Sequence, residues 1–368
     1  MPMQIVGTIT LTTHAHQTTP DGKDGNRNET TKTHIFCQDG TRRRIPFITA
    51  NSVRGLLRRA AAERVMDALG QPVTRQMFHV LTRGAADRAG IGETPTVAAM
   101  TAGNRHVFAG LFGGGPYMLH SRYGIGPLLP LVAWCEHLLH PALKPLAIPL
   151  EQLRYKRVDE EGNESYADAP LTTDIILTGK DDLMMGKGEN RIANYQESLA
   201  AWLEQVQGGR VAKADLKSAK KAAREGVGAK VTQDAEAAGK SSDLNAFNFV
   251  EAMLPGTPLQ FWLRLKPTST QAQIGLALIA VRDWANANVL GGASARGFGR
   301  FNAQLALYDG DVLVAPTVFR MGDHATAYGF SDDVTPYVDA AQRELDAMTI
   351  EDLDTVYPAI GEKKKKAA

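Results

Sequence analysis

The run of nine residues from Asn51 to Arg59 carries side chains that are suited to binding an anion. Ser52 offers a hydroxyl donor, and Arg54 and Arg58 lie one helical turn apart, so two planar guanidinium groups are expected on one helix face. If a helix begins here, its first backbone N–H groups, including that of Asn51, and the positive end of its dipole also favour a phosphate. Gly55 would permit the close approach of a backbone or a base.

The alternative interpretation of this run is an ordinary N-cap followed by a solvated arginine face. A second cluster of cations precedes it, because Arg42, Arg43 and Arg44 are consecutive. Two basic clusters so close in sequence favour a polyanion partner, since binding depends on local charge more than on the net charge of the chain. We therefore assign phosphate contacts to both clusters.

A glycine-rich segment from Gly291 to Arg300 is the second candidate site. Its glycines leave backbone N–H groups free to face an anion, and we expect Gly292 and Gly297 to supply such donors. Ser294 and Arg296 add side-chain donors. The ring of Phe298 either stacks on a base or anchors the following strand. The segment lacks the Gly-Lys-Ser/Thr of a nucleotide-binding P-loop.

Histidines near the N-terminus raise the question of a metal site, because His14 and His16, with His34 and Cys37, could supply four zinc ligands. Their spacing is not that of a known zinc module. Loop histidines that contact RNA, or that are simply polar, explain His14 and His16 with fewer assumptions. We expect no metal and no cofactor.

The elements that must position these residues follow from periodicity. Apolar and polar residues alternate at both ends of the chain, and helix-like spacing separates them. We expect strands at 3–13, 117–119, 128–134, 171–178, 247–254, 259–265 and 300–308, and helices at 49–70, 270–286 and 335–348. This order predicts an α+β fold with an RRM- or ferredoxin-like core, in which helices cover one face of an antiparallel sheet.

Composition sets broad limits on the chain. Its 368 residues, 43% of them hydrophobic and 22% charged, are typical of a soluble globular protein, and the net charge is only +1. No apolar stretch is long enough for a membrane helix, and the first residues do not resemble a signal peptide. With two cysteines far apart in sequence, the expectation is a reduced, cytoplasmic protein with no membrane contact.

The two candidate sites, in this order, resemble the hallmarks of the CRISPR-associated RAMP superfamily. The first reads Ile45-Pro46 through Ser52-Val53-Arg54-Gly55, and the second ends in Gly297-Phe298-Gly299 before the last strand. Together with His14-Ala15-His16-Gln17, the pattern looks most like the type IV version of the guide-RNA-binding backbone subunit of a class 1 effector complex. The resemblance covers both ends of the core well and residues 71 to 245 poorly.

This resemblance implies a palm that holds the guide's sugar–phosphate backbone and a thumb that wedges between bases. It further implies guide RNA, copies of the same chain arranged head-to-tail, other effector subunits and a paired target strand as partners. The expected parts are a discontinuous palm at 1–70, 117–178 and 246–320, a helical insertion at 71–116, a thumb-like arm at 179–245, and a C-terminal helix with a basic tail at 321–368.

Two alternatives to this interpretation stay open. Type III relatives cut RNA with an aspartate in the loop after the first strand, and this loop contains Asp21, Asp24, Asp39 and Glu29. Each aspartate precedes a glycine, as tight turns prefer, so binding without cleavage is the favoured hypothesis. The other alternative is a free-standing protein that binds single-stranded nucleic acid.

Overall fold

The computed structural model divides the chain into two compact units. The first comprises Met1–Thr19, Thr30–Thr173 and Ala252–Ala368, and the second comprises Pro20–Glu29 and Asp174–Glu251. The residues that the structure describes are 1–24, 27–38, 40–84, 96–158, 162–180, 193–201, 203–204, 245–321 and 328–358. Most of the predicted thumb-like arm and the lysine-rich tail therefore lie outside the described residues, and the predicted domain boundaries stay a prediction.

The first unit is built on a five-stranded sheet in the order β13-β12-β1-β11-β6, with every neighbouring pair antiparallel. Its elements are β1 (Met3–Leu11), α1 (Ala50–Leu69), β6 (Tyr123–Ile125), β11 (Pro258–Leu265), α7 (Gln271–Ala287), β12 (Phe301–Asp309) and β13 (Val312–Ala315). Without β13, the strands lie side by side in the order β12, β1, β11, β6, which are the fourth, first, third and second along the chain. Helix α1 follows the first strand and helix α7 follows the third. This is the βαββαβ plan of the ferredoxin-like fold, so the predicted fold class is confirmed.

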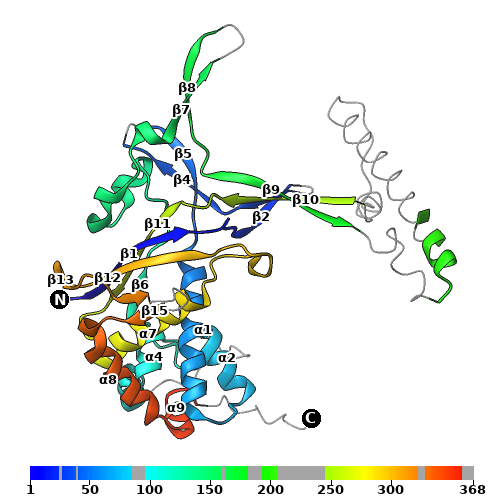
Figure 1. Cartoon of the computed structure of the whole chain (residues 1–368). Helices are drawn as coiled ribbons and strands as arrows, with labels where there is room; N and C mark the ends of the chain where they lie inside the picture. The colour runs from blue at the N-terminus through cyan, green and yellow to red at the C-terminus, as the bar shows by residue number, and fades with distance from the viewer. Residues whose placement is uncertain are drawn as a thin grey trace. The chain divides into compact units, whose positions relative to one another are not determined.

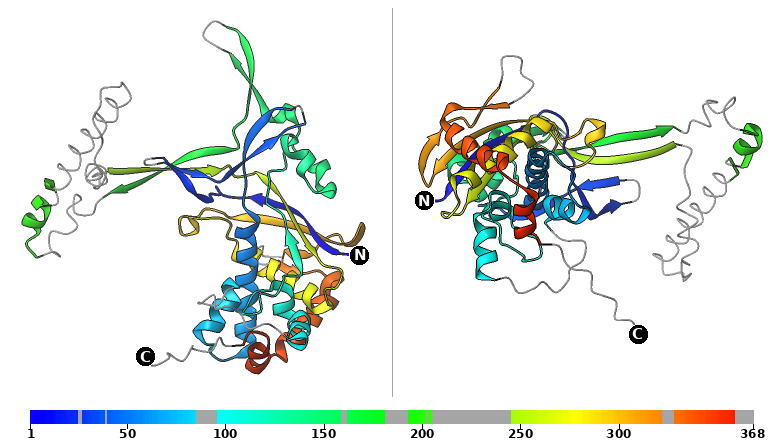
Figure 2. Two further views of the ribbon diagram at one scale, coloured as in Figure 1. Left: turned by 180° about the vertical axis from the view of Figure 1, so that it is seen from behind. Right: turned by 90° about the horizontal axis from the view of Figure 1, so that it is seen from below.

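Alternation along the strands gives the sheet one fully apolar face. Ile5 of β1 lies between Leu263 of β11 and Leu307 of β12, and all three are buried. These residues belong to the larger hydrophobic core, to which α1 and α7 contribute their inner faces. Figure 2 shows the helices gathered on this side of the sheet.

Side chains at the helix ends explain where these helices begin. Thr49 caps α1 by accepting a hydrogen bond from the Ser52 amide, and Gly70 ends the helix in a left-handed conformation. At the start of α7, Thr270 and Gln273 form a capping box. The other α-helices in the described part of the unit are α2 (Arg75–Arg83), α3 (Val97–Arg105), α4 (Val107–Phe112), α8 (Thr335–Asp346) and α9 (Ile350–Val356).

The other face of the sheet supports a second, smaller hydrophobic cluster. It joins Val6 of β1 to Trp134, Leu131 and the inner face of one hairpin, while Leu153, just before a second hairpin, is also buried in it. The hairpins are formed by β4 (Lys32–Phe36) with β5 (Arg42–Pro46), and by β7 (Arg154–Val158) with β8 (Glu164–Asp168). Figure 1 shows both hairpins on the side of the sheet opposite the labelled α-helices.

The second unit contains a four-stranded sheet in the order β2-β3-β10-β9. Its strands are β2 (Thr18–Asp24), β3 (Arg27–Thr30), β9 (Thr172–Lys180) and β10 (Asn245–Met253). Within this unit, Arg27 forms ion pairs with Asp174 at 3.1 Å and with the buried Glu251 at 3.8 Å. Glu251 is the only charged side chain that is buried in the described part of this sheet, and these pairs place it beside a cation.

Two of the predicted strands are wrong. Residues 117–119 lie in a turn closed by a bridge between Gly114 and Leu119, and residues 128–132 form only isolated bridges, such as the one from Leu128 to Ile48. The second edge of the sheet is instead β6, a three-residue strand that periodicity could not reveal.

Two short strands, β14 (Phe319–Met321) and β15 (Tyr328–Phe330), complete the described strands. No helix within the described ranges has the length and apolar character needed to cross a membrane.

Candidate nucleic-acid interface

The segment from His14 to Gln17 brings the two sequence motifs together. Gln17 forms two hydrogen bonds with the cap of α1: its Nε2 donates to Thr49 Oγ1, and the Thr49 amide donates to its Oε1, both at 2.9 Å. On the other side, the Gly292 amide donates to the His16 carbonyl and the Gly299 amide to the His14 carbonyl, both at 2.7 Å. The start of α1 and the glycine-rich loop therefore flank one short segment.

The start of α1 presents an exposed first turn. Asn51 and Arg54 are exposed, and the turn contains no acidic residue, so nothing on the helix itself neutralises the positive end of its dipole. The guanidinium of Arg54 lies 5.5 Å from the ring centroid of Tyr123, which supports the side chain without burying it. Asn51, Ser52 and Arg54 thus lie at the start of α1, and their contact with a phosphate stays a prediction.

Arg58 is buried, which corrects its assignment as a phosphate contact. Its guanidinium donates hydrogen bonds to four carbonyl oxygens, at distances of 2.6 to 3.1 Å. The acceptors are Val80, Leu81, Phe112 and Gly113, at the C-terminal ends of α2 and α4. Helix ends leave carbonyls without partners inside the helix, and Arg58 supplies donors for two such ends at once. Its burial, which lowers the pKa of the guanidinium, leaves no access for a phosphate.

The backbone of the glycine-rich loop is used within the protein, which corrects a second expectation. The Gly292 amide is bonded to His16, and the Gly297 amide donates to the Ser294 carbonyl at 2.9 Å. Neither is left to face an anion. The Arg296 side chain is exposed and Ser294 is half-buried. The loop therefore offers side-chain donors, but not the backbone cradle that its glycines suggested.

Two aromatic residues of the predicted site are structural. Phe298 is 8% exposed, and its ring centroid lies 6.2 Å from that of His14, so it anchors the loop and does not stack on a base. His16 is 4% exposed, and its Nε2 lies 3.1 Å from Thr18 Oγ1. Of the two histidines, only the half-buried His14 borders the surface.

The arginine triplet lies on β5, where alternation separates its members. Arg43 points inward: it forms an ion pair with Asp168, and its guanidinium lies 4.7 Å from the ring centroid of Trp134. Arg42 and Arg44 point the other way and are exposed. Phosphate contact stays a prediction for the exposed outer pair, whereas Arg43 holds the base of the β7–β8 hairpin through Asp168.

The base of the β4–β5 hairpin lies beside the start of α1. The Thr31 amide donates to the Gln17 carbonyl at 2.8 Å, and the Phe47 amide donates to the Thr31 carbonyl at 3.2 Å. Since β5 ends at Pro46 and Thr49 caps α1, the chain runs directly from the hairpin into the helix. Arg42, Arg44, Arg54 and Arg296 are thus exposed cations of one continuous framework, and they form what we call the basic surface.

The proposed zinc ligands and the acidic residues of the first loop do not form one site in the described part of the chain. His34 and Cys37 lie on β4 and just after it, with His34 exposed and Cys37 buried in the second cluster, so two of the four zinc ligands do not converge. Among the described residues, no three histidine, cysteine or acidic side chains gather where a metal ion could be held. Glu29 pairs with Arg27 in the second unit. The side chains of Asp21, Asp24 and Asp39 lie outside the described residues.

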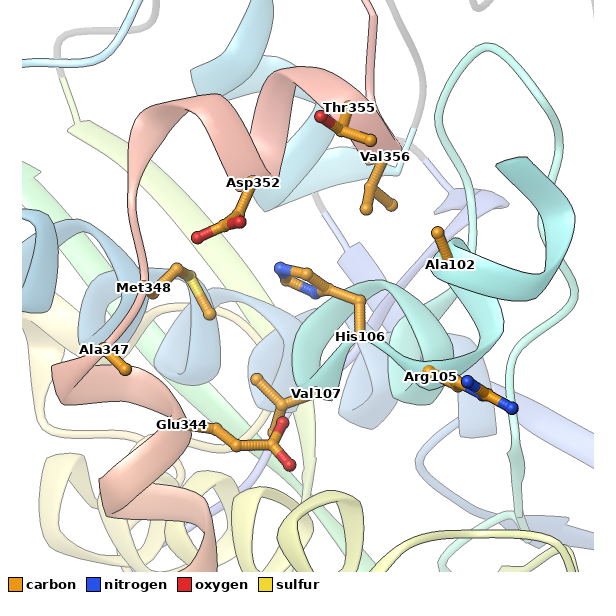
Figure 3. Close-up of a pocket in the computed structure, with 10 residues that line it drawn as sticks. All are labelled: Ala102, Arg105, His106, Val107, Glu344, Ala347, Met348, Asp352, Thr355 and Val356. Atoms are coloured by element: carbon orange, nitrogen blue, oxygen red, sulfur yellow. The ribbon is translucent and has the colours of Figure 1, made fainter. Parts of the chain in front are cut away.

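A cavity of about 400 Å³ opens elsewhere on the first unit, between α3 and α4 on one side and α8 and α9 on the other. His106 extends into it toward Asp352, with Glu344 and Met348 nearby (Figure 3). Nδ1 of His106 accepts hydrogen bonds from the amides of Phe108 and Ala109, and burial lowers its pKa to about 4. The histidine is therefore a neutral helix cap, which a sequence pattern does not reveal.

Sequence reasoning missed one residue beside the basic surface. Phe36 is 71% exposed on β4, directly opposite Arg42 of β5. The alternation of Ile35 and Cys37 with His34 and Phe36 could have indicated an outward aromatic side chain. A strand of five residues gives too little periodicity to be predicted from sequence.

The likeness of this chain to known proteins is distant and lies in structure, not in sequence. No family model matches the chain, and no curated protein matches it in sequence. Among solved structures, it is similar to a chain of a Type IV-B CRISPR complex, with a TM-score of 0.45 and 15% sequence identity over 85% of this chain and 92% of that chain. A likeness so distant does not assign a function, and the functional conclusion rests on the residues of this chain.

Proposed function

We propose that this chain is the guide-RNA-binding backbone subunit of a type IV CRISPR effector complex. The observation that carries the proposal is the junction at His14–Gln17, which holds the start of α1 and the glycine-rich loop against one segment. These are the two motifs whose order resembles the RAMP superfamily. Exposed cations lie on both motifs, Arg54 on α1 and Arg296 in the loop, and such cations bind a sugar–phosphate backbone.

The basic surface suits an RNA that is held without reading its sequence. Guanidinium groups bind phosphates in a planar, bidentate manner, and they contact no base edge while doing so. We further propose that copies of the chain assemble head-to-tail along the guide and that the subunit binds without cleaving. Binding without cleavage is supported by Glu29, whose carboxylate is held by an ion pair with Arg27 in the second unit.

The first test is to express the chain with its own CRISPR array and to separate the product by size. A large particle with a high 260/280 nm ratio and repeat–spacer RNA of uniform length is the expected result. A monomer without RNA, in the presence of the array, would contradict the proposal and favour a free-standing binding protein. Metal-dependent cutting of a paired target, lost in variants of Asp21, Asp24 or Glu29, would favour a type III-like nuclease.

A second test addresses the basic surface directly. The double variant Arg54→Gln/Arg296→Gln should lower the slope of log affinity against log salt for single-stranded RNA by about 1.4, or about 0.7 for each lost phosphate contact. The matched control is Arg64→Gln. Arg64 lies on the same helix, but its guanidinium is paired with Asp283 at 2.6 Å. An equal change of slope in both variants would show that α1 attracts RNA only through its overall charge.

A further inference from the structure

The outer face of the β4–β5 hairpin combines an exposed aromatic ring with cations. Because directly opposite residues of an antiparallel pair share a face, Phe36 lies beside Arg42, and His34 lies beside Arg44. Arg42, Arg44 and His34 are exposed, and Lys32 follows on the same face at half burial. Between residues 32 and 46, the described part of this face carries no acidic side chain.

The inner face of the same hairpin is firmly anchored. Ile35, Cys37 and Ile45 are buried in the second hydrophobic cluster, which also contains Trp134. Arg43 is held by Asp168 and by the Trp134 ring. A two-stranded hairpin is marginal in isolation, but packing of one face fixes its strands. The outer side chains are therefore displayed on a rigid support.

The exposed ring of Phe36 leaves apolar surface in water that a stacking partner would cover. Single-stranded nucleic acid fits the surroundings of Phe36. An aromatic ring stacks on any base, and arginines beside it hold the phosphates. Arg42 and Arg44 are two residues apart, or about 6.6 Å along the strand, which suits successive phosphates of an unstacked strand. Since the net charge of the chain is only +1, this cationic excess is local.

The β7–β8 hairpin supports this choice of ligand by contrast. It also exposes an aromatic residue beside a cation, since Tyr166 is 74% exposed and lies opposite Lys156. However, Lys156 is paired with Glu164, and Arg154 with Asp168 at 3.4 Å. A face of mixed charge does not favour a polyanion. The two hairpins thus share an exposed aromatic ring, but only β4–β5 complements a phosphate backbone.

We propose that the β4–β5 hairpin is a base-stacking platform, on which the ring of Phe36 stacks against a base of single-stranded RNA while Arg42 and Arg44 hold the adjacent phosphates. The inference rests on the proposed function, since it assumes that the chain binds RNA. It adds a contact to bases that neither sequence motif supplies, because Phe298 is buried.

The test uses the full-length chain and a single-stranded RNA of mixed sequence that contains 2-aminopurine. Phe36→Ala should weaken binding ~5- to 100-fold and reduce the quenching of 2-aminopurine, because one stacked base is lost. Its salt slope should stay unchanged, since the phosphate contacts remain. Phe36→Trp should restore both signals. The matched control is Tyr166→Ala, which removes an equally exposed ring from the neighbouring hairpin and should leave both signals unchanged.

The outcomes separate the inference from the proposed function. If wild-type protein binds the RNA and Arg54→Gln/Arg296→Gln weakens it, but Phe36→Ala does not, the platform is wrong and the function stands. A wild-type protein without salt-sensitive affinity contradicts the function itself. If Phe36→Ala changes only the oligomeric state, measured by mass photometry, the hairpin is a protein interface and the inference is overturned. Thermal melting checks that each variant is folded; since Phe36 is exposed, little change is expected.

Discussion

Arginine serves different purposes on the two sides of the five-stranded sheet. On the helical side, Arg58 is buried and donates to four carbonyl oxygens at the ends of α2 and α4. On the opposite side, Arg42 and Arg44 extend from β5 and are exposed. All three belong to the basic clusters found in the sequence. The comparison shows that an arginine beside a ligand-binding motif can stabilise the fold instead, by donating hydrogen bonds to carbonyls at helix ends.

The largest effect should come from removing the buried arginine. Arg58→Met removes a donor from four buried carbonyls, of which those of Val80 and Gly113 still accept from the Gly84 amide and the Tyr357 hydroxyl, so we expect a loss of about 2–4 kcal/mol in the free energy of unfolding. Arg54→Met, one turn earlier on the exposed face, should change stability by less than about 0.5 kcal/mol. Urea unfolding of both variants checks this. Equal losses would erase the distinction between the two positions.

The glycine-rich loop allows the same comparison with two glycines. Gly299 has a φ of +76°, and a Cβ there would lie 1.9 Å from the Leu290 carbonyl oxygen, so Gly299→Ala should cost about 2–3 kcal/mol. At Gly292 the nearest atom to a Cβ would be the His16 oxygen at 3.7 Å. Gly292→Ala should therefore fold normally. The midpoints of denaturant unfolding measure the stability of both variants. A severe loss of stability in Gly292→Ala would contradict the loop geometry.

Acid should weaken the helical side through His106. Its folded pKa of about 4 lies below the unfolded value of 6.5, so the unfolded state binds the proton first and stability falls as pH drops through this window. The expected loss is about 2 kcal/mol between pH 7 and pH 5. His106→Asn keeps a capping side chain without the titration. Unfolding curves at several pH values should show a smaller dependence in this variant, and an identical dependence would assign the effect to other groups.

The smallest expected effect concerns Gly55 in the first half of α1. A Cβ there would meet only the flexible Arg59 side chain, at 3.4 Å, so the packing of the fold does not require glycine. Gly55→Ala should stabilise the chain by about 0.5–1 kcal/mol, because alanine favours a helix. If a backbone or a base of RNA approaches this position closely, the same variant should bind RNA more weakly. A gain in stability with unchanged affinity would remove Gly55 from the interface.

Much of the fold could be predicted because its strands and helices are long and periodic. β1, β11, β12, α1 and α7 were all expected close to their observed bounds. β6 was missed because three residues that include a glycine carry no period. The pairing of the sheet, in which β1 is central, depends on contacts between residues far apart in sequence, and it followed only from the general plan of the fold.

The candidate site was predicted less completely, for a physical reason. Residue types located the start of α1 and the loop that ends at Gly299, and both lie beside His14–Gln17. Whether a donor is free depends on its tertiary partners, however. The sequence shows that Arg58 and Gly297 are present, but it does not show that their donors are already bonded to carbonyl oxygens of the protein. Exposure of Phe36 likewise depends on which face of β4 packs inward.

The hydrogen bonds at the base of the second unit have a consequence for how this chain can diverge. Its first excursion, after Gln17, is closed where the Thr31 amide meets the Gln17 carbonyl at 2.8 Å. Its second is closed where the Leu254 amide meets the Leu171 carbonyl at 3.1 Å. Doubling the length of a flexible excursion that is already closed costs only about 0.6 kcal/mol. Relatives could therefore lengthen, shorten or exchange both excursions while inheriting the junction at His14–Gln17 unaltered.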